Sequence, residues 1–119
     1  MNDQTPRLAI TQQGAVTVVE LVDKKILDEA AIAEIGEAMF AQVAEVADPK
    51  MVVDFINVAH MSSSMLGTLI TLNKRVREKG GSLCLCNIGP SIYEVFVITR
   101  LNEVFQICDG RAQAVQRAT

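Results

Sequence analysis

The feature that most constrains the fold is a regular alternation of short apolar runs with amphipathic helical segments. Two β-branched runs, residues 8–10 and 15–22, flank a turn at Gly14 and predict a β-hairpin. Three helix–strand alternations and a last helix follow. Strands that alternate with helices form a sheet with helices on its faces. The sequence therefore predicts an α/β fold with a mixed, mainly parallel sheet of roughly four to five strands and about four helices, packed mainly on one side.

Helical spacing marks the two longer helices. Asp28 is placed to cap the first, with Glu29 in its first turn, and this helix is expected to end near residues 48–49. Its buried face is predicted to hold Ile32, Ile35, Met39, Val43 and Val46. The second helix follows residues 62–64 and stops at the two glycines 80–81. Its helical period runs through Leu66, Leu69, Ile70, Asn73 and Val76.

Three further strands complete the predicted sheet. Residues 51–55 are interpreted as a buried strand from which Asp54 emerges at the C-terminal edge of the sheet. Residues 82–86 and 104–107 are the next two strands, with a short helix from Pro90 between them and a last helix after them.

Composition narrows the function. A length of 119 residues suits one compact domain, in which residues 1–7 are expected to form a loose N-terminal segment. The net charge is −3, and the aromatic residues are four Phe and one Tyr. Neither the basic surface of a duplex binder nor an aromatic platform for single strands is therefore expected. We predict no nucleic-acid partner.

The chain is expected to work in a reducing cytoplasm. It opens without a basic and then apolar leader, and no apolar run approaches the roughly 20 residues that span a bilayer, so no integral membrane segment is predicted. Three cysteines, an odd number, cannot all pair within one chain. Cys84 and Cys86 share one strand face without a metal-ligand pattern, so they and Cys108 are interpreted as small buried side chains. No metal site and no cofactor are predicted.

The serine run at residues 62–64 is the most unusual feature. It lies between the strand that ends near Asp54 and a helix rich in Leu and Ile. Serine hydroxyls commonly cap helices by accepting from free backbone N–H groups, which would explain one of the three. The alternative is a phosphorylation site. A phosphoserine adds roughly −1.5 to −2 charges beside the positive end of a helix, which the fold tolerates and a partner fitted to a neutral hydroxyl does not.

Enzyme chemistry has little support in the sequence. His60 is the single histidine, and a Ser63–His60–Asp54 triad can be drawn, but no glycine-framed serine elbow accompanies it. Neither common glycine motif for nucleotides occurs. The basic residues between positions 74 and 79 are interpreted as a solvated helix end. We expect a protein that is not an enzyme, with a small serine hydrolase as a distant alternative.

Residues 53–67, VDFINVAHMSSSMLG, resemble the signature loop of STAS domains, in particular of the bacterial anti-sigma factor antagonists. In that family a strand ends in Asp, and Asp-Ser-Ser-Gly-Leu-Gly opens a helix. Residues 96–107, FVITRLNEVFQI, resemble the family's helix, Thr-Gly-Leu and final strand. The order of strands and helices corresponds over nearly the whole chain, so one STAS-like domain over residues 1–119 is expected.

The resemblance implies regulation of transcription by partner switching. An unmodified antagonist binds an anti-sigma factor that is also a GHKL-type serine kinase, which frees the sigma factor. The kinase uses ATP to phosphorylate a loop serine, the complex dissociates, and a PP2C-type phosphatase resets the switch. The phosphorylated position corresponds to Ser63, with Ser62 and Ser64 as less favoured targets. We expect a monomer or a weak dimer.

The residues predicted to bind the partner lie on this loop and the helix that follows. They are Asp54, Ser62, Ser63, Ser64, Met65, Leu66, Gly67, Leu69 and Leu72, with a place in the core as the alternative for Leu69. Ser62 and Met65 stand where the family has Asp and Gly, and Arg100 replaces the Gly of Thr-Gly-Leu. The missing carboxylate is expected to alter kinase recognition, and Met65 to project an apolar side chain at the interface. These departures favour the alternative of a non-switching scaffold or an accessory subunit of a stressosome-like or lipid-transport assembly.

Overall fold

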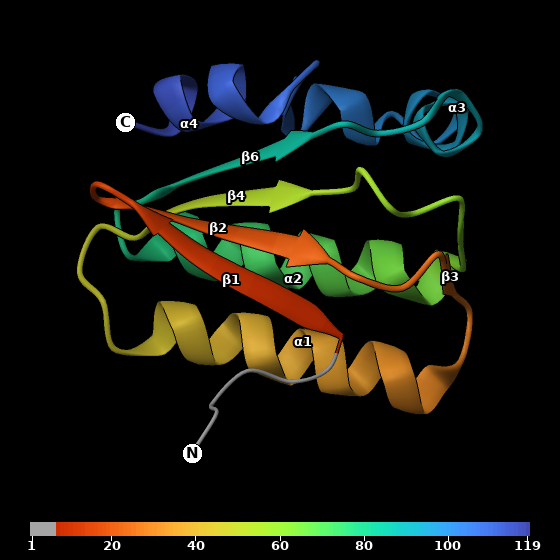
Figure 1. Ribbon diagram of the computed structural model, residues 1–119, viewed down its shortest axis with the longest axis horizontal. Coiled ribbons are helices and arrows are strands. Elements are labelled where there is room, and N and C mark those ends of the chain that lie inside the picture. Colours follow the sequence, from red (N-terminus) through yellow and green to blue (C-terminus); the bar gives the residue numbers. More distant parts are fainter. Residues whose placement is uncertain (1–6) are drawn as a thin grey trace.

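A five-stranded mixed sheet forms the centre of the computed structural model, which describes residues 7–119 (Figure 1). In spatial order its strands are β1 (Leu8–Gln13), β2 (Val16–Leu21), β4 (Lys50–Asp54), β6 (Ser82–Cys86) and β7 (Gln106–Cys108). β1 and β2 form an antiparallel hairpin, and the other neighbours pair in parallel. The predicted mixed sheet is confirmed, and β1 extends to residue 13 rather than 10.

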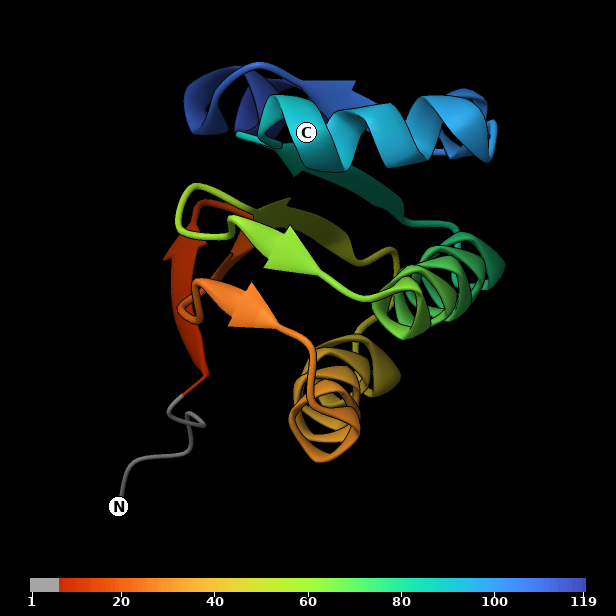
Figure 2. The same ribbon diagram turned by 90° about the vertical axis from the view of Figure 1, so that its right-hand side faces the viewer.

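Helices cover both faces of this sheet. α1 (Glu29–Ala44) and α2 (Ser63–Glu78) lie side by side on one face, and α4 (Arg111–Ala118) lies on the other (Figure 2). α3 (Pro90–Ile98) contributes its two buried side chains to the core that α1 and α2 share. Three of the four α-helices therefore serve one core, in agreement with the prediction of helices mainly on one side.

The apolar run of β4 is buried on both faces of the sheet. Met51 and Val53 belong to the larger core beneath α1 and α2, whereas Val52 belongs to a smaller core beneath α4. Because side chains alternate along a strand, burial on both faces requires a continuous apolar run, and Asp54 is the first polar residue after it.

The smaller core contains the three cysteines, which are free thiols. The Sγ atoms of Cys84 and Cys108 are 3.2 Å apart. Burial raises the pKa of both Cys84 and Cys86 to about 12, so these thiols stay neutral and pack as small apolar side chains. The interpretation of the cysteines as buried core residues is confirmed.

A two-stranded sheet that the sequence analysis did not anticipate lies just before α2. Its strands, β3 (Lys25–Ile26) and β5 (His60–Met61), pair in parallel. The N–H of Ser62 continues this pairing by donating to the carbonyl of Ile26 at 2.9 Å. Strands of two residues are too short to show a period in the sequence. This small sheet fixes the place where α2 begins.

Helix ends and faces differ from the prediction at several positions. Asp28 caps α1 as expected, because its Oδ2 accepts from the N–H three residues on at 3.0 Å. α1 ends at Ala44, so Val46 lies beyond the helix and is exposed rather than buried. In α2 the predicted buried positions Leu66, Leu69, Asn73 and Val76 are buried, whereas Ile70 is exposed. The predictions for Val46 and Ile70 were wrong.

The connection between α3 and β7 holds a residue in the left-handed region. Arg100 has φ 62° and ψ 17°, immediately before the 3-10 helix η1 (Leu101–Glu103). The STAS pattern that the sequence resembles has glycine at this position, and glycine adopts such angles without a Cβ penalty. Because η1 takes up residues 101–103, the last strand spans residues 106–108 rather than 104–107.

We expect Arg100→Gly to raise the free energy of unfolding by about 0.5–1 kcal/mol, because it removes the left-handed strain at an exposed position. The same change at Arg77, an exposed residue within α2, should lower it by about 1 kcal/mol. Urea denaturation of the two variants tests this pair. Equal destabilisation by both would show that residue 100 is not strained.

Candidate functional site

The start of α2 places the three serine hydroxyls in different surroundings. Ser62 is the N-cap residue, but its side chain makes no capping hydrogen bond, and its Oγ is buried without a partner among the described residues. Ser63 opens the helix and is exposed. Ser64 is also exposed and donates its hydroxyl to Oε2 of Glu29 at 2.8 Å. The capping interpretation is therefore wrong for all three serines.

A hollow of about 310 Å³ lies beside Ser63, between the start of α2 and the first half of α3. It is lined by Ala59, His60, Met61, Ser62, Ser63, Leu66, Ser91, Ile92 and Val95. None of these residues is acidic, and the N-terminus of α2 adds partial positive charge. The hollow therefore offers apolar and hydroxyl contacts in surroundings that favour a negative group.

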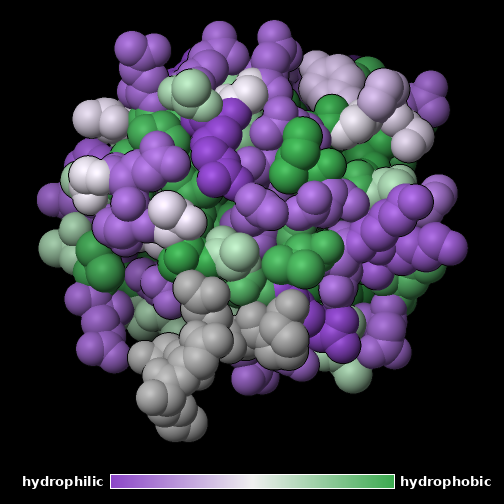
Figure 3. All heavy atoms as spheres, in the orientation of Figure 1, coloured by the Kyte–Doolittle hydropathy of each residue, from purple (hydrophilic) through white to green (hydrophobic). Residues whose placement is uncertain are grey.

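α3 carries several exposed apolar side chains, of which Val95 lines this hollow. Tyr93, Val95 and Val97 are each at least 40% exposed, and Ile98 is 74% exposed. On the face drawn in Figure 3, hydrophilic side chains surround separate groups of apolar ones. Exposed apolar side chains concentrated on one helix are typical of an interaction surface, so α3 is a candidate for one.

Several of the predicted partner contacts belong to the core instead. Met65, Leu69 and Leu72 are fully buried, and Leu66 is 7% exposed. The three fully buried side chains lie on the face of α2 that packs into the core, so they cannot meet a partner in this conformation, whereas Leu66 lines the hollow. The predictions of surface contacts at Met65 and Leu72 were wrong, and Leu69 takes the core position that was its alternative. Gly67, one turn after Ser63, is exposed.

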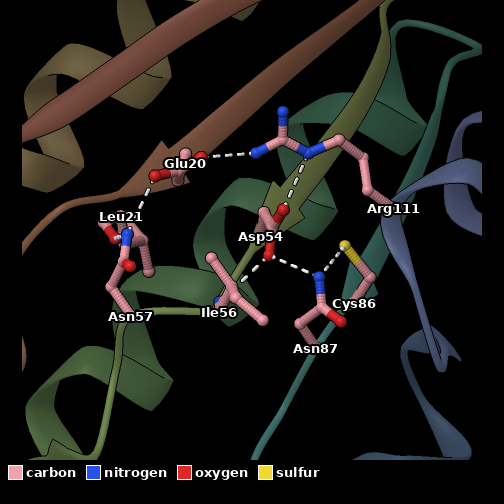
Figure 4. Close-up of polar contacts among 8 residues, drawn as sticks. All are labelled: Glu20, Leu21, Asp54, Ile56, Asn57, Cys86, Asn87 and Arg111. Carbon is pink, nitrogen blue, oxygen red and sulfur yellow. Dashed lines mark hydrogen bonds and ion pairs between the residues drawn. The ribbon is translucent and has the colours of Figure 1, made fainter.

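Asp54 is also buried, at 1% exposure, and it is not a surface contact as predicted. Its Oδ1 accepts from the backbone N–H of Ile56 at 3.0 Å and from Nδ2 of Asn87 at 2.9 Å. Its Oδ2 accepts from Nε of Arg111 at 2.8 Å. Figure 4 shows these partners converging on the end of β4. Every contact is internal, so Asp54 organises the fold here.

Arg111 joins two carboxylates at this edge of the sheet. Besides Asp54, it pairs with Glu20 at the end of β2, at 2.5 Å, and Glu20 in turn accepts from Asn57 (Figure 4). The hydrogen bond to Asp54 is the main cause of a raised pKa of Arg111, which keeps the guanidinium charged. Sequence reasoning missed this residue. The sequence did contain one indication of its role. Arg111 is a cation in the first turn of a helix, a place that the helix dipole disfavours unless carboxylates lie nearby.

The catalytic triad drawn from the sequence is not assembled. Ser63 and His60 line the same hollow, whereas Asp54 bonds to Arg111, Ile56 and Asn87. Within residues 7–119, no group of three or more His, Cys, Asp or Glu is placed to hold a metal ion. None of the helices in that range is long and apolar enough to cross a membrane.

A mixed sheet with α2 opening on a serine run is the arrangement expected of a STAS domain. The profile of the STAS domain matches residues 7–114. The chain belongs to the STAS domain family.

Relatives and solved structures agree with this assignment. BtrV of Bordetella bronchiseptica, whose name marks it as a candidate anti-sigma factor antagonist, is 29% identical over 82 residues, which is 69% of this chain and 71% of that protein. The anti-sigma-factor antagonist (STAS) domain protein of Planctomyces limnophilus superposes with a TM-score of 0.83 at 22% identity, over 93% of this chain and 97% of that one. Bacillus SpoIIAA in its phosphorylated form superposes with a TM-score of 0.72 at 18% identity, over 94% and 99%.

We expect Arg111→Ala to lower the free energy of unfolding by about 2–3 kcal/mol, because it leaves the buried Asp54 carboxylate without its cation. Arg117→Ala, also on α4, removes an exposed hydrogen bond to Gln106 and should cost less than about 0.5 kcal/mol. Chemical denaturation measures both. A similar loss in the two variants would contradict a structural role for the Arg111 pair.

Proposed function

We propose that this chain is an anti-sigma factor antagonist-type binding module that acts by partner switching, with Ser63 as the phosphorylated residue. The observation that carries the proposal is the environment of Ser63. Among the three serines it alone combines an exposed side chain with a hydroxyl that has no partner in residues 7–119. The names of the relatives support the same role.

The physical basis of the switch is the placement of Ser63 at the first position of α2. A phosphate there gains from the helix dipole and from free backbone N–H groups, so the domain stays folded. A partner that covers the serine would have to desolvate a dianion, which is costly. The modification therefore acts on the complex rather than on the fold.

The contact surface that we propose follows from what is exposed. It comprises Ser63, Ser64 and Gly67 on α2, the partly exposed N-cap residue Ser62, whose hydroxyl oxygen is buried, and Val95 across the hollow. The proposed partners are an anti-sigma factor serine kinase of the GHKL type and a PP2C-type phosphatase. The proposed setting is the cytoplasm.

We expect Ser63→Asp to weaken binding to the partner kinase, once it is captured from a lysate of the source cells, by about tenfold or more. The free energy of unfolding should change by less than about 0.5 kcal/mol. Ser63→Ala should retain binding and lose phosphate incorporation. Gln116→Glu, which adds a carboxylate to α4 on the opposite face, is the charge control and should bind like the unmodified protein. Titration of each variant against the kinase, with ATP incubation and peptide mass mapping, gives both readouts.

The outcomes of this experiment separate the candidate functions. Capture of a GHKL-type kinase from a lysate of the source cells, followed by phosphate on Ser63, supports switching. Capture of transporter or scaffold subunits, with no phosphate on any serine, favours the accessory role instead. Phosphate found only outside residues 62–64 would refute the site assignment.

Gly67 gives a second, steric test of the same surface. It is exposed within α2, and a Cβ built there meets nothing within 4 Å. Gly67→Ala and Gly67→Gln should therefore both raise the free energy of unfolding, by about 0.5–1 kcal/mol, since each replaces a helical glycine. Binding to the kinase should fall by about tenfold for Gln and much less for Ala. Unchanged binding by the Gln variant would remove Gly67 from the interface.

A further inference from the structure

α1 and α2 begin at the same end of the molecule and run in parallel (Figure 1). Glu29, the first residue of α1, accepts the hydroxyl of Ser64 at 2.8 Å. One turn further along α2, Thr68 faces the same helix, because its Cγ2 lies 3.0 Å from the place where a Cβ on Gly36 would stand. The glycine lets the two helices approach closely, and this approach holds Ser64 beside Glu29.

Ser63 lies on a different side of α2. Successive residues of a helix are turned by about 100°, so a helix that directs Ser64 at α1 turns Ser63 away from it. Ser63 accordingly lines the hollow beside α3. The contact between Ser64 and Glu29 is thus made without any involvement of the Ser63 hydroxyl.

The negative charge nearest the start of α2 comes from α1, from the carboxylate of Glu29. The first turn of α2 contains no acidic residue, and Ser62 provides no side-chain cap. An uncapped helix start carries partial positive charge and free N–H groups. The carboxylate that reaches a hydroxyl of this turn is that of Glu29.

We propose that Glu29 is a specificity-determining residue of the phosphorylation switch. It engages the Ser64 hydroxyl and so directs modification to Ser63. Its carboxylate, held beside Ser64 in the same turn of α2, also repels a second negative charge placed on the neighbouring Ser63. This inference rests on the proposed function, and it assigns to α1 a part in the selection of the modified serine on α2.

A double-mutant cycle of melting temperatures, which needs no partner protein, tests whether Glu29 repels a negative charge at residue 63. Ser63→Glu places a carboxylate where the phosphate would lie, and it should raise the melting temperature by about 2 °C more in a Glu29→Gln background than in the unmodified protein. Glu37→Gln, an exposed position about two turns further along α1, is the matched control and should leave the effect of Ser63→Glu unchanged. Equal shifts in all three backgrounds would overturn the charge coupling.

Mapping of phosphate by the captured kinase tests the selection of the serine. Glu29→Gln keeps an oxygen that can accept from Ser64, so phosphate should stay on Ser63. Glu29→Ala removes the acceptor, and phosphate should appear on Ser64 as well, reaching at least about a tenth of the Ser63 level because the hydroxyl is then free. In Ser63→Ala, phosphate should be absent, and in Ser63→Ala/Glu29→Ala it should be found on Ser64.

The two experiments fail in distinguishable ways. If no variant accepts phosphate, the proposed function fails, and the double-mutant cycle alone decides whether the Glu29 carboxylate repels a negative charge at residue 63. If Ser63 accepts phosphate but Ser64 never does in Glu29→Ala, the proposed function stands and the role of Glu29 in selection is wrong. Asp28 still caps α1 in every variant, so loss of folding is not expected to obscure the result.

Discussion

The rotation of α2 about its own axis is the constraint on which the site depends. Burial of Met65, Leu69 and Leu72 fixes that rotation, because each would lose its apolar contacts if the helix turned. With the buried stripe fixed, Ser64 must face α1 and Ser63 must face the hollow. The core therefore determines which hydroxyl is presented, although Met65, Leu69 and Leu72 do not themselves line the hollow.

Asp54 at the end of β4 and Ser63 at the start of α2 are both polar, but they have different roles. Asp54 is enclosed, and its oxygens accept from Arg111, Asn87 and the backbone, which ties α4 and the loop after β6 to the sheet. Ser63 has an open side chain and no such partners among the described residues. A group whose contacts are all internal stabilises the fold, whereas an exposed group at a helix start is available to a second molecule. The structure separates these roles within ten residues of sequence.

Much of the fold could be predicted from the sequence because it depends on periods and caps. The strand alternation of β2, the continuous apolar run of β4 and the cap at Asp28 are local signals, and each gave the correct element. The second sheet, β3 with β5, escaped prediction because its pairing joins residues far apart in sequence over only two positions. Arg111 was missed for a related reason, since its meaning depends on Glu20 and Asp54, which only the folded sheet brings near it.

The two departures from the family's serine motif have different physical consequences. Met65 is fully buried, so a methionine in place of glycine adds volume to the core and does not alter the surface that a partner meets. Ser62 is the consequential change, because it leaves the first turn of α2 without a carboxylate. Glu29 lies across the helix pair, hydrogen-bonded to Ser64, and restores a negative group there. A charge supplied from a neighbouring helix can serve the same electrostatic purpose as one within the motif, provided that helix packing fixes its position.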